Sequence, residues 1–249
     1  MRKLFQFMLM VSVLACGATA QADVYDKAVS NPARSEKDQK VDERRKPAEV
    51  MRFFELKPGM KVLDVFAGGG YYTELMSYVV GEDGKVALYN NAPWDKFVGK
   101  AVAERLADNR LPNVERIVTT PESLIDLDQK YDAAVFILGM HDVYYAHPED
   151  GWPAIDKQKF LKGIHHLLKD DAIFGVIDAN ALPGANNAEV GKKFHRVDPQ
   201  AMIDDIQAAG FKLESQSEIL RNPEDDKISS VFTPENRYKT DRSILKFRK

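Results

Sequence analysis

The amino-acid sequence predicts an α/β protein built on a doubly wound, mostly parallel sheet of seven strands. Short apolar runs alternate with amphipathic segments from residue 60 onward, as in strands connected by helices. A glycine-rich turn, Gly68–Gly70, separates the first apolar run from a helical pattern. Two strand-like runs late in the chain have no helix between them, which predicts one antiparallel strand near the edge of the sheet.

Each predicted element rests on a local pattern. Pro47 favours the first position of a helix, and Lys57-Pro58-Gly59 ends that helix. The run Val62–Phe66 has almost no polar alternation, which indicates a strand covered on both faces. The strands are expected at 61–66, 85–89, 114–118, 133–138, 172–177, 211–219 and 243–247, and the later helices at 71–80, 95–107, 155–168 and 199–209.

The N-terminus has the three parts of a secretory signal peptide in the right order. A positive start, Met1–Lys3, precedes an apolar stretch and then small residues, with cleavage expected after Ala22 or after Ala20. We therefore expect a periplasmic or secreted protein. The alternative is a lipoprotein cleaved before Cys16 and anchored through it, because the residues before Cys16 loosely resemble a lipoprotein box. The apolar stretch is too short to span a bilayer comfortably, so no stable membrane insertion is expected after cleavage.

Composition limits the remaining possibilities. Residues 23–43 are polar and predict an extended arm, and residues 44–249 predict one domain. Cys16 is the only cysteine, so a chain cleaved after Ala22 has no disulfide and no thiolate chemistry. Loss of Arg2 and Lys3 changes the formal net charge from −3 to −5, and basic residues are interspersed with acids. A small-molecule substrate is therefore favoured over nucleic acid.

The turn at Gly68–Gly70 is the best candidate for a binding loop. Ligands of doubly wound sheets bind beyond the carboxyl ends of the strands, where glycines allow close approach of the backbone and a helix start presents its amides. The third glycine of a dinucleotide fingerprint is replaced by Thr73, and no Lys-Ser/Thr pair follows to make a phosphate loop. A turn that serves only chain reversal is the alternative.

The run Val62–Thr73 resembles the first motif of class I S-adenosylmethionine (SAM)-dependent methyltransferases. A wider pattern resembles one bacterial family of predicted methyltransferases that are often exported, and it covers essentially the whole mature chain. The resemblance implies the Rossmann-like class I methyltransferase fold, with SAM as cofactor. The segments that carry it are Arg45–Glu49, Leu56–Met60, Gly68–Thr73, Met140–Asp142, Phe194–Asp198, Ala209–Phe211 and Lys239–Arg242.

The same resemblance implies a set of cofactor-binding residues. Phe66 replaces the first glycine of the motif, and Asn90 replaces the acid that holds the ribose. Thr120 replaces the acid near the adenine, with Glu122 as a possible substitute. Each loss of a charged hydrogen bond is expected to weaken binding by about 1–2 kcal/mol. The implied set is Asp64, Ala67, Gly68, Gly69, Gly70, Tyr71, Asn90, Thr120 and Glu122.

The predicted chemistry centres on the end of the fourth strand. His141 is the candidate base that removes a proton from an acceptor, with Asp142 orienting it or binding substrate; a purely structural histidine is the alternative. Methyl transfer itself depends mainly on positioning of donor and acceptor.

Four further residues are expected to contact the acceptor. Tyr144 and Tyr145 belong to an aromatic loop, residues 144–153, that predicts a lid. His195 and Arg196 lie in the region that covers the site in this fold, although Arg196 could instead pair with Asp198.

Other charged residues are expected to be structural or uncommitted. Asp178 either faces the pocket or caps the loop that follows it. The histidines match no metal-binding spacing, so no metal is expected. Asp225, Asp226 and Arg242 predict an ion pair at the sheet edge without chemistry.

Three functions are compatible with these patterns. The leading hypothesis is a SAM-dependent methyltransferase with a small-molecule acceptor. The second is a methyltransferase-like protein of the cell envelope that binds a ligand without turnover, which the substitutions at Phe66, Asn90 and Thr120 favour. The third, a nicotinamide-dependent oxidoreductase, lacks the glycine fingerprint and a Tyr-x-x-x-Lys pair.

Overall fold

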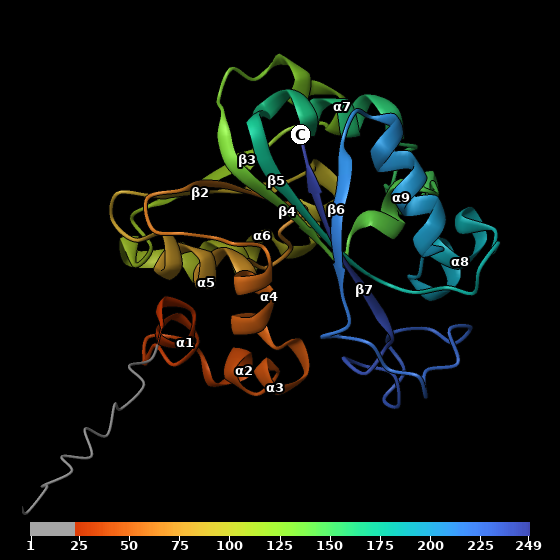
Figure 1. The fold of residues 1–249 in the computed structure, drawn as a ribbon, viewed down its shortest axis with the longest axis horizontal. Helices are drawn as coiled ribbons and strands as arrows, with labels where there is room; N and C mark the ends of the chain where they lie inside the picture. The colour runs from red at the N-terminus through yellow and green to blue at the C-terminus, as the bar shows by residue number, and fades with distance from the viewer. Residues whose placement is uncertain (1–22) are drawn as a thin grey trace, which may run out of the picture.

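The computed structural model describes residues 23–249 and shows a seven-stranded sheet in the order β3-β2-β1-β4-β5-β7-β6 (Figure 1). The predicted signal peptide and Cys16 lie outside the described residues. The strands are β1 (Lys61–Val65), β2 (Lys85–Asn90), β3 (Val114–Val118), β4 (Tyr131–Ile137), β5 (Leu168–Ala179), β6 (Lys212–Ser217) and β7 (Arg242–Arg248).

The directions of the strands confirm the predicted fold class. Neighbouring strands from β3 to β5 are parallel, whereas β7 lies antiparallel to both β5 and β6. The register of β5 and β7 places Ser243 opposite Asp178 and Arg242 opposite Ala179. This register brings the start of β7 to the carboxyl end of β5, where a ligand site is expected.

Helices connect the strands and cover both faces of the sheet. The four helices predicted beyond residue 60 are present within a few residues of their expected bounds, and α8 is an additional helix capped by the Asn186 side chain. The α-helices from residue 47 onward are α4 (Pro47–Phe53), α5 (Tyr71–Val80), α6 (Ala92–Leu106), α7 (Lys157–Leu167), α8 (Asn187–Phe194) and α9 (Pro199–Ala208). Short 3-10 helices are η1 (Ala107–Asn109), η2 (Pro121–Asp126), η3 (Met140–Val143) and η4 (Pro148–Asp150).

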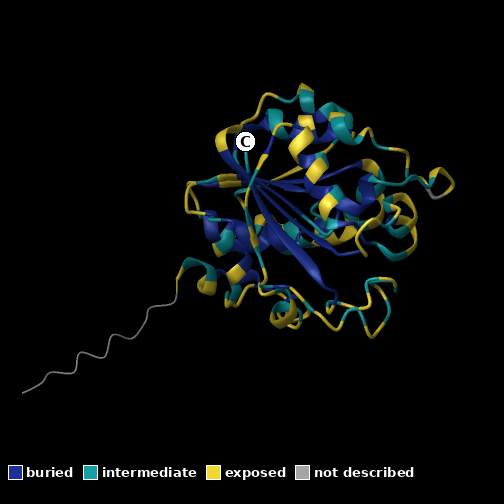
Figure 2. Cartoon of the chain, turned by 45° about the vertical axis from the view of Figure 1, so that its right-hand side comes forward, coloured by how far each residue is buried: buried dark blue, intermediate teal, exposed yellow. Residues whose placement is uncertain are grey.

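The core consists of two apolar layers separated by the sheet. One layer joins the sheet to α7 and α9, and the other joins it to α4 and α5. Figure 2 shows the buried residues concentrated in the strands, with exposed residues along the outer helices and loops. Burial on both faces explains why the central strands are almost continuously apolar.

The N-terminal segment is not the extended arm that its polarity predicts. It forms α1 (Val24–Val29), α2 (Glu36–Gln39) and α3 (Asp42–Arg45), and α1 contributes the buried Ala28 to the same apolar layer as α4 and α5. The Tyr25 hydroxyl donates to the Leu56 carbonyl at 2.7 Å. Side-chain caps at Asp23 and Ser35 satisfy the first amides of α1 and α2. Local capping therefore orders a segment whose composition offers little apolar surface.

Among residues 23–249, no helix has the length and apolar character needed to cross a bilayer.

Candidate functional site

A cavity of about 540 Å³ lies at the carboxyl ends of β4 and β5. Its volume is within the range of about 300–1,000 Å³ that small-molecule sites occupy. Its polar centre contains His141, Asp142 and Asp178, and its walls are largely aromatic and aliphatic. The cavity therefore combines an apolar enclosure with a few convergent polar groups, as ligand sites do.

His141 is fixed at the centre of the cavity by two hydrogen bonds to Asp178. The backbone amide of His141, in η3 just after β4, donates to Asp178 Oδ2 at 2.8 Å. Its ring Nδ1 lies 3.0 Å from Asp178 Oδ1. Asp178 is completely buried near the end of β5. A carboxylate that holds Nδ1 sets the ring tautomer and leaves Nε2 for chemistry.

The second ring nitrogen of His141 faces a histidine and a carboxylate. Nε2 lies 3.2 Å from Nδ1 of His195, which follows α8 in a left-handed conformation with φ of 55°. It also lies 3.3 Å from Asp142 Oδ1, which accepts a hydrogen bond from the Tyr145 hydroxyl at 2.8 Å. The predicted residues His141, Asp142, Tyr145 and His195 therefore form one connected network.

The two histidines have opposite protonation preferences. Burial disfavours charge on His141, but the carboxylates of Asp178 and Asp142 outweigh it and raise the pKa of His141 to about 9. Burial and the charge of His141 lower the pKa of His195 to about 4. At neutral pH His141 is therefore an imidazolium with a proton on each ring nitrogen, and His195 is neutral.

The same atoms are close enough to be metal ligands. One ligand atom from each of His141, Asp142 and His195 lies within 4.8 Å of the others, and all three residues are at least half-buried. These short distances are accounted for by the hydrogen bond between His141 and His195 and by the ion pair between His141 and Asp142, which need a proton on His141 and no metal ion. The geometry therefore does not require an ion.

The glycine turn is half-covered by neighbouring side chains. A side chain at Gly69 would contact Ala101 at 3.7 Å, and one at Gly70 would clash with Arg105 at 2.9 Å, because α6 packs over this part of the turn. Gly68, with φ of +57°, faces open space and remains partly exposed, as does Ala67. Gly70 is therefore buried, whereas Gly68 and Gly69 remain partly exposed.

Asn90 closes the turn from the neighbouring strand. Its side-chain carbonyl accepts from the Gly68 amide at 3.0 Å, and its amide donates to the Gly68 carbonyl at 3.0 Å. Asn90 is completely buried. Both polar atoms of the residue expected to hold a ribose are thus used to join β2 to the turn.

Phe66, which replaces a motif glycine, belongs to the core. Its backbone has a φ of 48°, and its ring stacks on Phe160 with a centroid distance of 5.2 Å. Phe136 contacts it edge-on at 5.5 Å, and Trp152 of the lid loop lies 6.2 Å away. The ring is absent from the cavity lining. Phe66 therefore fills space in the core and leaves the cavity open.

The other implied cofactor residues have partners within the protein. Asp64 is buried and accepts from the Thr73 hydroxyl at 2.5 Å, and burial raises its pKa to about 7. The Tyr71 hydroxyl donates to Asp42 at 2.5 Å. The Thr120 hydroxyl donates to Ser123, and Glu122 accepts from the Asp156 amide. None of these four residues lines the cavity.

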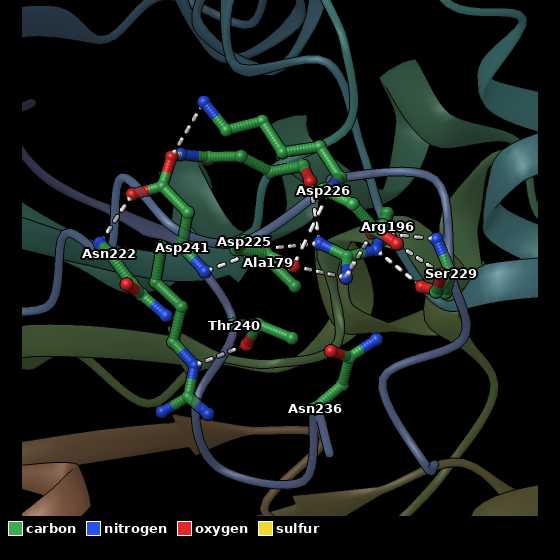
Figure 3. Close-up of polar contacts among 12 residues, drawn as sticks. Ala179, Arg196, Asn222, Asp225, Asp226, Ser229, Asn236, Thr240 and Asp241 are labelled. Carbon is green, nitrogen blue, oxygen red and sulfur yellow. Dashed lines mark hydrogen bonds and ion pairs between the residues drawn. The ribbon is translucent and has the colours of Figure 1, made fainter.

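Two of the predicted acceptor residues point away from the cavity. The Tyr144 hydroxyl donates to Asp205 at 2.6 Å. Arg196 is completely buried and forms two hydrogen bonds with the Asp225 carboxylate, at 2.7 and 2.8 Å (Figure 3). It also donates to the Ser229 carbonyl. Arg196 is therefore a structural cation, and it takes the place expected for Arg242 in the ion pair with Asp225 and Asp226.

The cavity also contains residues that the sequence patterns did not single out. Trp94 and Phe97 come from α6, and Phe97 is 83% exposed. Arg45 and Arg242 belong to segments that carry the family resemblance, but their place in the cavity depends on neighbours that are distant in sequence. The only local signal was the pair of aromatic residues after β2, Trp94 and Phe97, which is weak because surface aromatic residues are common.

Comparisons with known proteins agree on the fold. The structure is similar to that of a SAM-dependent methyltransferase from Aquifex aeolicus, with a TM-score of 0.54 and 19% identity, over 85% of this chain and 97% of that one. The [4+2]-cyclase SpnF aligns with a TM-score of 0.61 at 15% identity, over 83% of this chain and 81% of that one. The fold is that of class I SAM-dependent methyltransferases.

Sequence comparisons find methyltransferases over part of the chain. The family model for protein-L-isoaspartate (D-aspartate) O-methyltransferase matches residues 19–114. A ubiquinone/menaquinone biosynthesis C-methyltransferase, UbiE, of Shewanella piezotolerans is 34% identical over 35% of this chain and 34% of its own. A demethylmenaquinone methyltransferase of Bacillus mycoides is 35% identical over 38% of this chain and 39% of its own. The matches thus span little more than a third of these methyltransferases.

Proposed function

We propose that this protein is a SAM-dependent methyltransferase that acts on a small-molecule acceptor, with His141 as its base. The observation that carries the proposal is the Asp178–His141 pair, which opens into a ligand-sized cavity at the carboxyl edge of a methyltransferase fold. The sequence similarity to methyltransferases supports the same function.

The cavity offers polar and aromatic groups that suit the cofactor. The Trp94 indole and the Asp142 carboxylate are neighbours in its wall: burial raises the pKa of Asp142, and hydrogen bonding to Trp94 opposes that rise. Trp94 and the exposed Phe97 provide aromatic surface for an adenine ring. The carboxylate of Asp142 provides negative charge for a sulfonium. These lining residues fit SAM, but none of the cofactor-binding residues that the family resemblance implied, including the turn at Gly68–Gly70, lines the cavity.

The proposed chemistry requires one proton acceptor. When bound, SAM supplies an electrophilic methyl group. His141 Nε2 accepts the proton of an acceptor hydroxyl or amine, while Asp178 keeps the ring in place. Because the pKa of His141 is raised to about 9, its neutral, basic form is a minor fraction at neutral pH and increases as pH rises through 9. Tyr145 and Trp152 cover the same space and exclude water.

Calorimetry with SAM and S-adenosylhomocysteine tests the proposal directly. We expect the mature protein to bind both, and Phe97→Ala to weaken binding by about tenfold, within the 1–3 kcal/mol of base–aromatic stacking. Leu182→Ala is the matched control, because Leu182 is also exposed but lies outside the cavity lining. Absence of binding to either compound at millimolar concentration would overturn the proposal.

A second function is favoured by the contacts that other residues make with the glycine turn. Asn90 uses both polar side-chain atoms on Gly68, and Arg105 of α6 packs against the buried Gly70. These contacts support a methyltransferase-like protein that binds another small ligand without methyl transfer. The same calorimetry distinguishes the two functions, since this alternative predicts no affinity for SAM.

Export to the periplasm or beyond the cell is part of the proposal. It is supported by the signal-peptide pattern of residues 1–22. Mass spectrometry of protein isolated from its native envelope should give an N-terminus at Asp23. A lipidated N-terminus at Cys16 would support the anchored alternative instead.

A further inference from the structure

Three arginine side chains line the side of the cavity next to the start of β7. They are Arg45, which ends α3, Arg237, and Arg242, the first residue of β7. We propose that Arg45, Arg237 and Arg242 bind a carboxylate or phosphate group of the acceptor, so that the acceptor is an organic anion. This inference rests on the proposed function, because it names the substrate class of the same site.

Arg242 is a buried cation without a carboxylate partner. It is only 4% exposed, and its Nε donates to the Thr240 hydroxyl at 3.0 Å. Its two terminal nitrogens make no hydrogen bond to a described residue. Burial and the nearby charge of Arg45 lower the pKa of Arg242 to about 10, and it remains charged at neutral pH. A buried guanidinium with unused donors is built to receive an anion.

Arg45 is held in position by aromatic rings. Its guanidinium lies 4.4 Å from the ring centre of Tyr71 and 5.1 Å from that of Tyr238. Its Nε is buried without a hydrogen-bond partner among residues 23–249. Although burial raises the pKa of Tyr238, hydrogen bonding to Arg237 and the charges of Arg45 and Arg237 lower it overall. Arg45 and Arg237 therefore both interact with the Tyr238 phenol and lower its pKa.

Of the three arginines only Arg242 is buried, since Arg45 is partly exposed and Arg237 is exposed, and the other buried arginines of the described chain are neutralised by acids. Arg34 pairs with Asp42 at 2.7 Å, and Arg196 pairs with Asp225 at the same distance. By contrast, no described carboxylate lies within 4 Å of the guanidinium groups of Arg45, Arg237 or Arg242. The charge imbalance is thus confined to the wall of a cavity, where a ligand can correct it.

The charge of the cofactor favours the acceptor as the source of the anion. SAM carries a sulfonium and a zwitterionic amino-acid end. If its carboxylate were bound by the arginines, its ammonium would lie close to three guanidinium groups. The carboxylates that line the cavity, Asp142 and Asp178, are instead grouped around His141. An anionic acceptor has no such penalty, and planar guanidinium groups match carboxylate and phosphate oxygens.

The position of Arg242 relates the anion to the base. Arg242 pairs with Ala179 across the strands, and Ala179 follows Asp178, which holds His141. Side chains of consecutive strand residues point to opposite faces, so Asp178 and Arg242 reach the cavity from the two sides of the sheet edge. An acceptor that lies across this edge can place its anionic group at the arginines and its reacting atom at His141. The intervening wall, with Leu138 and Phe232, is apolar.

The test measures anion binding to the full mature chain and to matched arginine variants. The probes are phenyl phosphate and benzoate, titrated by calorimetry at constant ionic strength, with benzyl alcohol as the uncharged analogue. We expect the anions to bind, Arg242→Met and Arg45→Met each to weaken them at least tenfold, and benzyl alcohol to be indifferent to either change. Comparison of the two anions identifies phosphate or carboxylate as the preferred group.

Arg248→Met is the control for loss of one positive charge, because Arg248 pairs with Glu214 and Glu55 outside this cavity. The ligand-free Arg242→Met protein should melt no lower than the parent, since the substitution removes an unneutralised charge; this readout separates loss of binding from loss of folding.

Unchanged anion affinity in both arginine variants would overturn the inference. So would a loss of S-adenosylhomocysteine affinity as large as the loss of anion affinity, because the arginines would then hold the cofactor. If the protein binds the anions but does not bind SAM, the anion site at the arginines is supported and the proposed methyltransferase function is overturned.

Discussion

Asp178 accepts two hydrogen bonds from one residue, the backbone amide of His141 at 2.8 Å and its ring Nδ1 at 3.0 Å. The strand β5 thereby fixes both the backbone and the ring of a residue that follows β4. Because the same carboxylate helps to raise the pKa of His141 to about 9, position and protonation of the ring depend on one interaction.

Asp178→Asn should lower the pKa of His141 while leaving the ring close to its place. The amide can still accept a hydrogen bond but no longer stabilises the imidazolium by charge. We expect NMR titration of the His141 ring protons to show the lower pKa. In any methyl-transfer assay, the rise of kcat with pH should move to lower pH by a similar amount. Asp132→Asn, which removes a carboxylate that pairs with Lys169, is the control. An unchanged titration of His141 would contradict this account.

The raised pKa of His141 also predicts how stability depends on pH. The folded pKa of about 9 lies above the unfolded value of 6.5. The stabilisation is therefore fully present below pH 6.5 and is lost as pH rises through 9. Chemical denaturation at several pH values should show the free energy of unfolding falling across this window. His141→Gln should flatten that fall, and an equally steep fall in this variant would show that other groups cause it.

Asp64 should affect stability in a lower pH window. Burial raises its folded pKa to about 7 from an unfolded value of 3.8, against the opposing hydrogen bond from Thr73. Folding therefore favours the protonated acid, and the free energy of unfolding should fall as pH rises from about 4 to 7. Asp64→Asn keeps a hydrogen-bonding group without the charge and should remove this dependence. If the variant retains the full slope between pH 4 and 7, Asp64 is not its source.

The sequence predicted the fold better than the site because the two depend on different ranges of interaction. Strand burial and helix starts are local, so β1, the turn at Gly68 and the start of α5 lie where the pattern indicated. The histidine network was also accessible, since parallel strands bring the ends of β4 and β5 together. The three arginines that line the cavity could not be predicted as a group from the sequence. Arg242 and Arg45 become neighbours only because β7 packs beside β5 and α3 packs beside the rings of Tyr71 and Tyr238.

Arg196 shows the opposite error for the same reason. Its position after α8 suggested a ligand clamp, but its acid partner comes from a loop 29 residues later. Sequence spacing cannot tell which of two arginines receives a protein carboxylate and which is left for a ligand. Asp225 selects Arg196 and leaves Arg242 without an acid.

Phe66 offers a test of backbone strain at a motif glycine. Phe66→Ala should destabilise the protein by about 3–5 kcal/mol, because it removes a ring packed against Phe136, Phe160 and Trp152. Glycine is usually worse than alanine by about 0.5–1 kcal/mol in regular structure. At a φ of 48° the order should reverse, so that Phe66→Gly is more stable than Phe66→Ala by about 1–2 kcal/mol. Chemical denaturation of the two variants decides it, and an alanine variant as stable as the glycine variant would exclude strain at this position.

The Arg196–Asp225 pair should be important for stability and unimportant for ligand affinity. Both side chains are essentially inaccessible to solvent, so Arg196→Met leaves a buried carboxylate without its partner and should cost about 3–5 kcal/mol. The double variant Arg196→Met/Asp225→Leu removes both charges and should recover much of that loss, which a double-mutant cycle would measure as coupling. Arg52→Met is the matched control: Arg52 pairs with Asp23 at a site where both side chains are more than 40% exposed, so its loss should cost less than about 1 kcal/mol. If the effects of Arg196→Met and Asp225→Leu on the free energy of unfolding are additive, the two side chains do not stabilise each other.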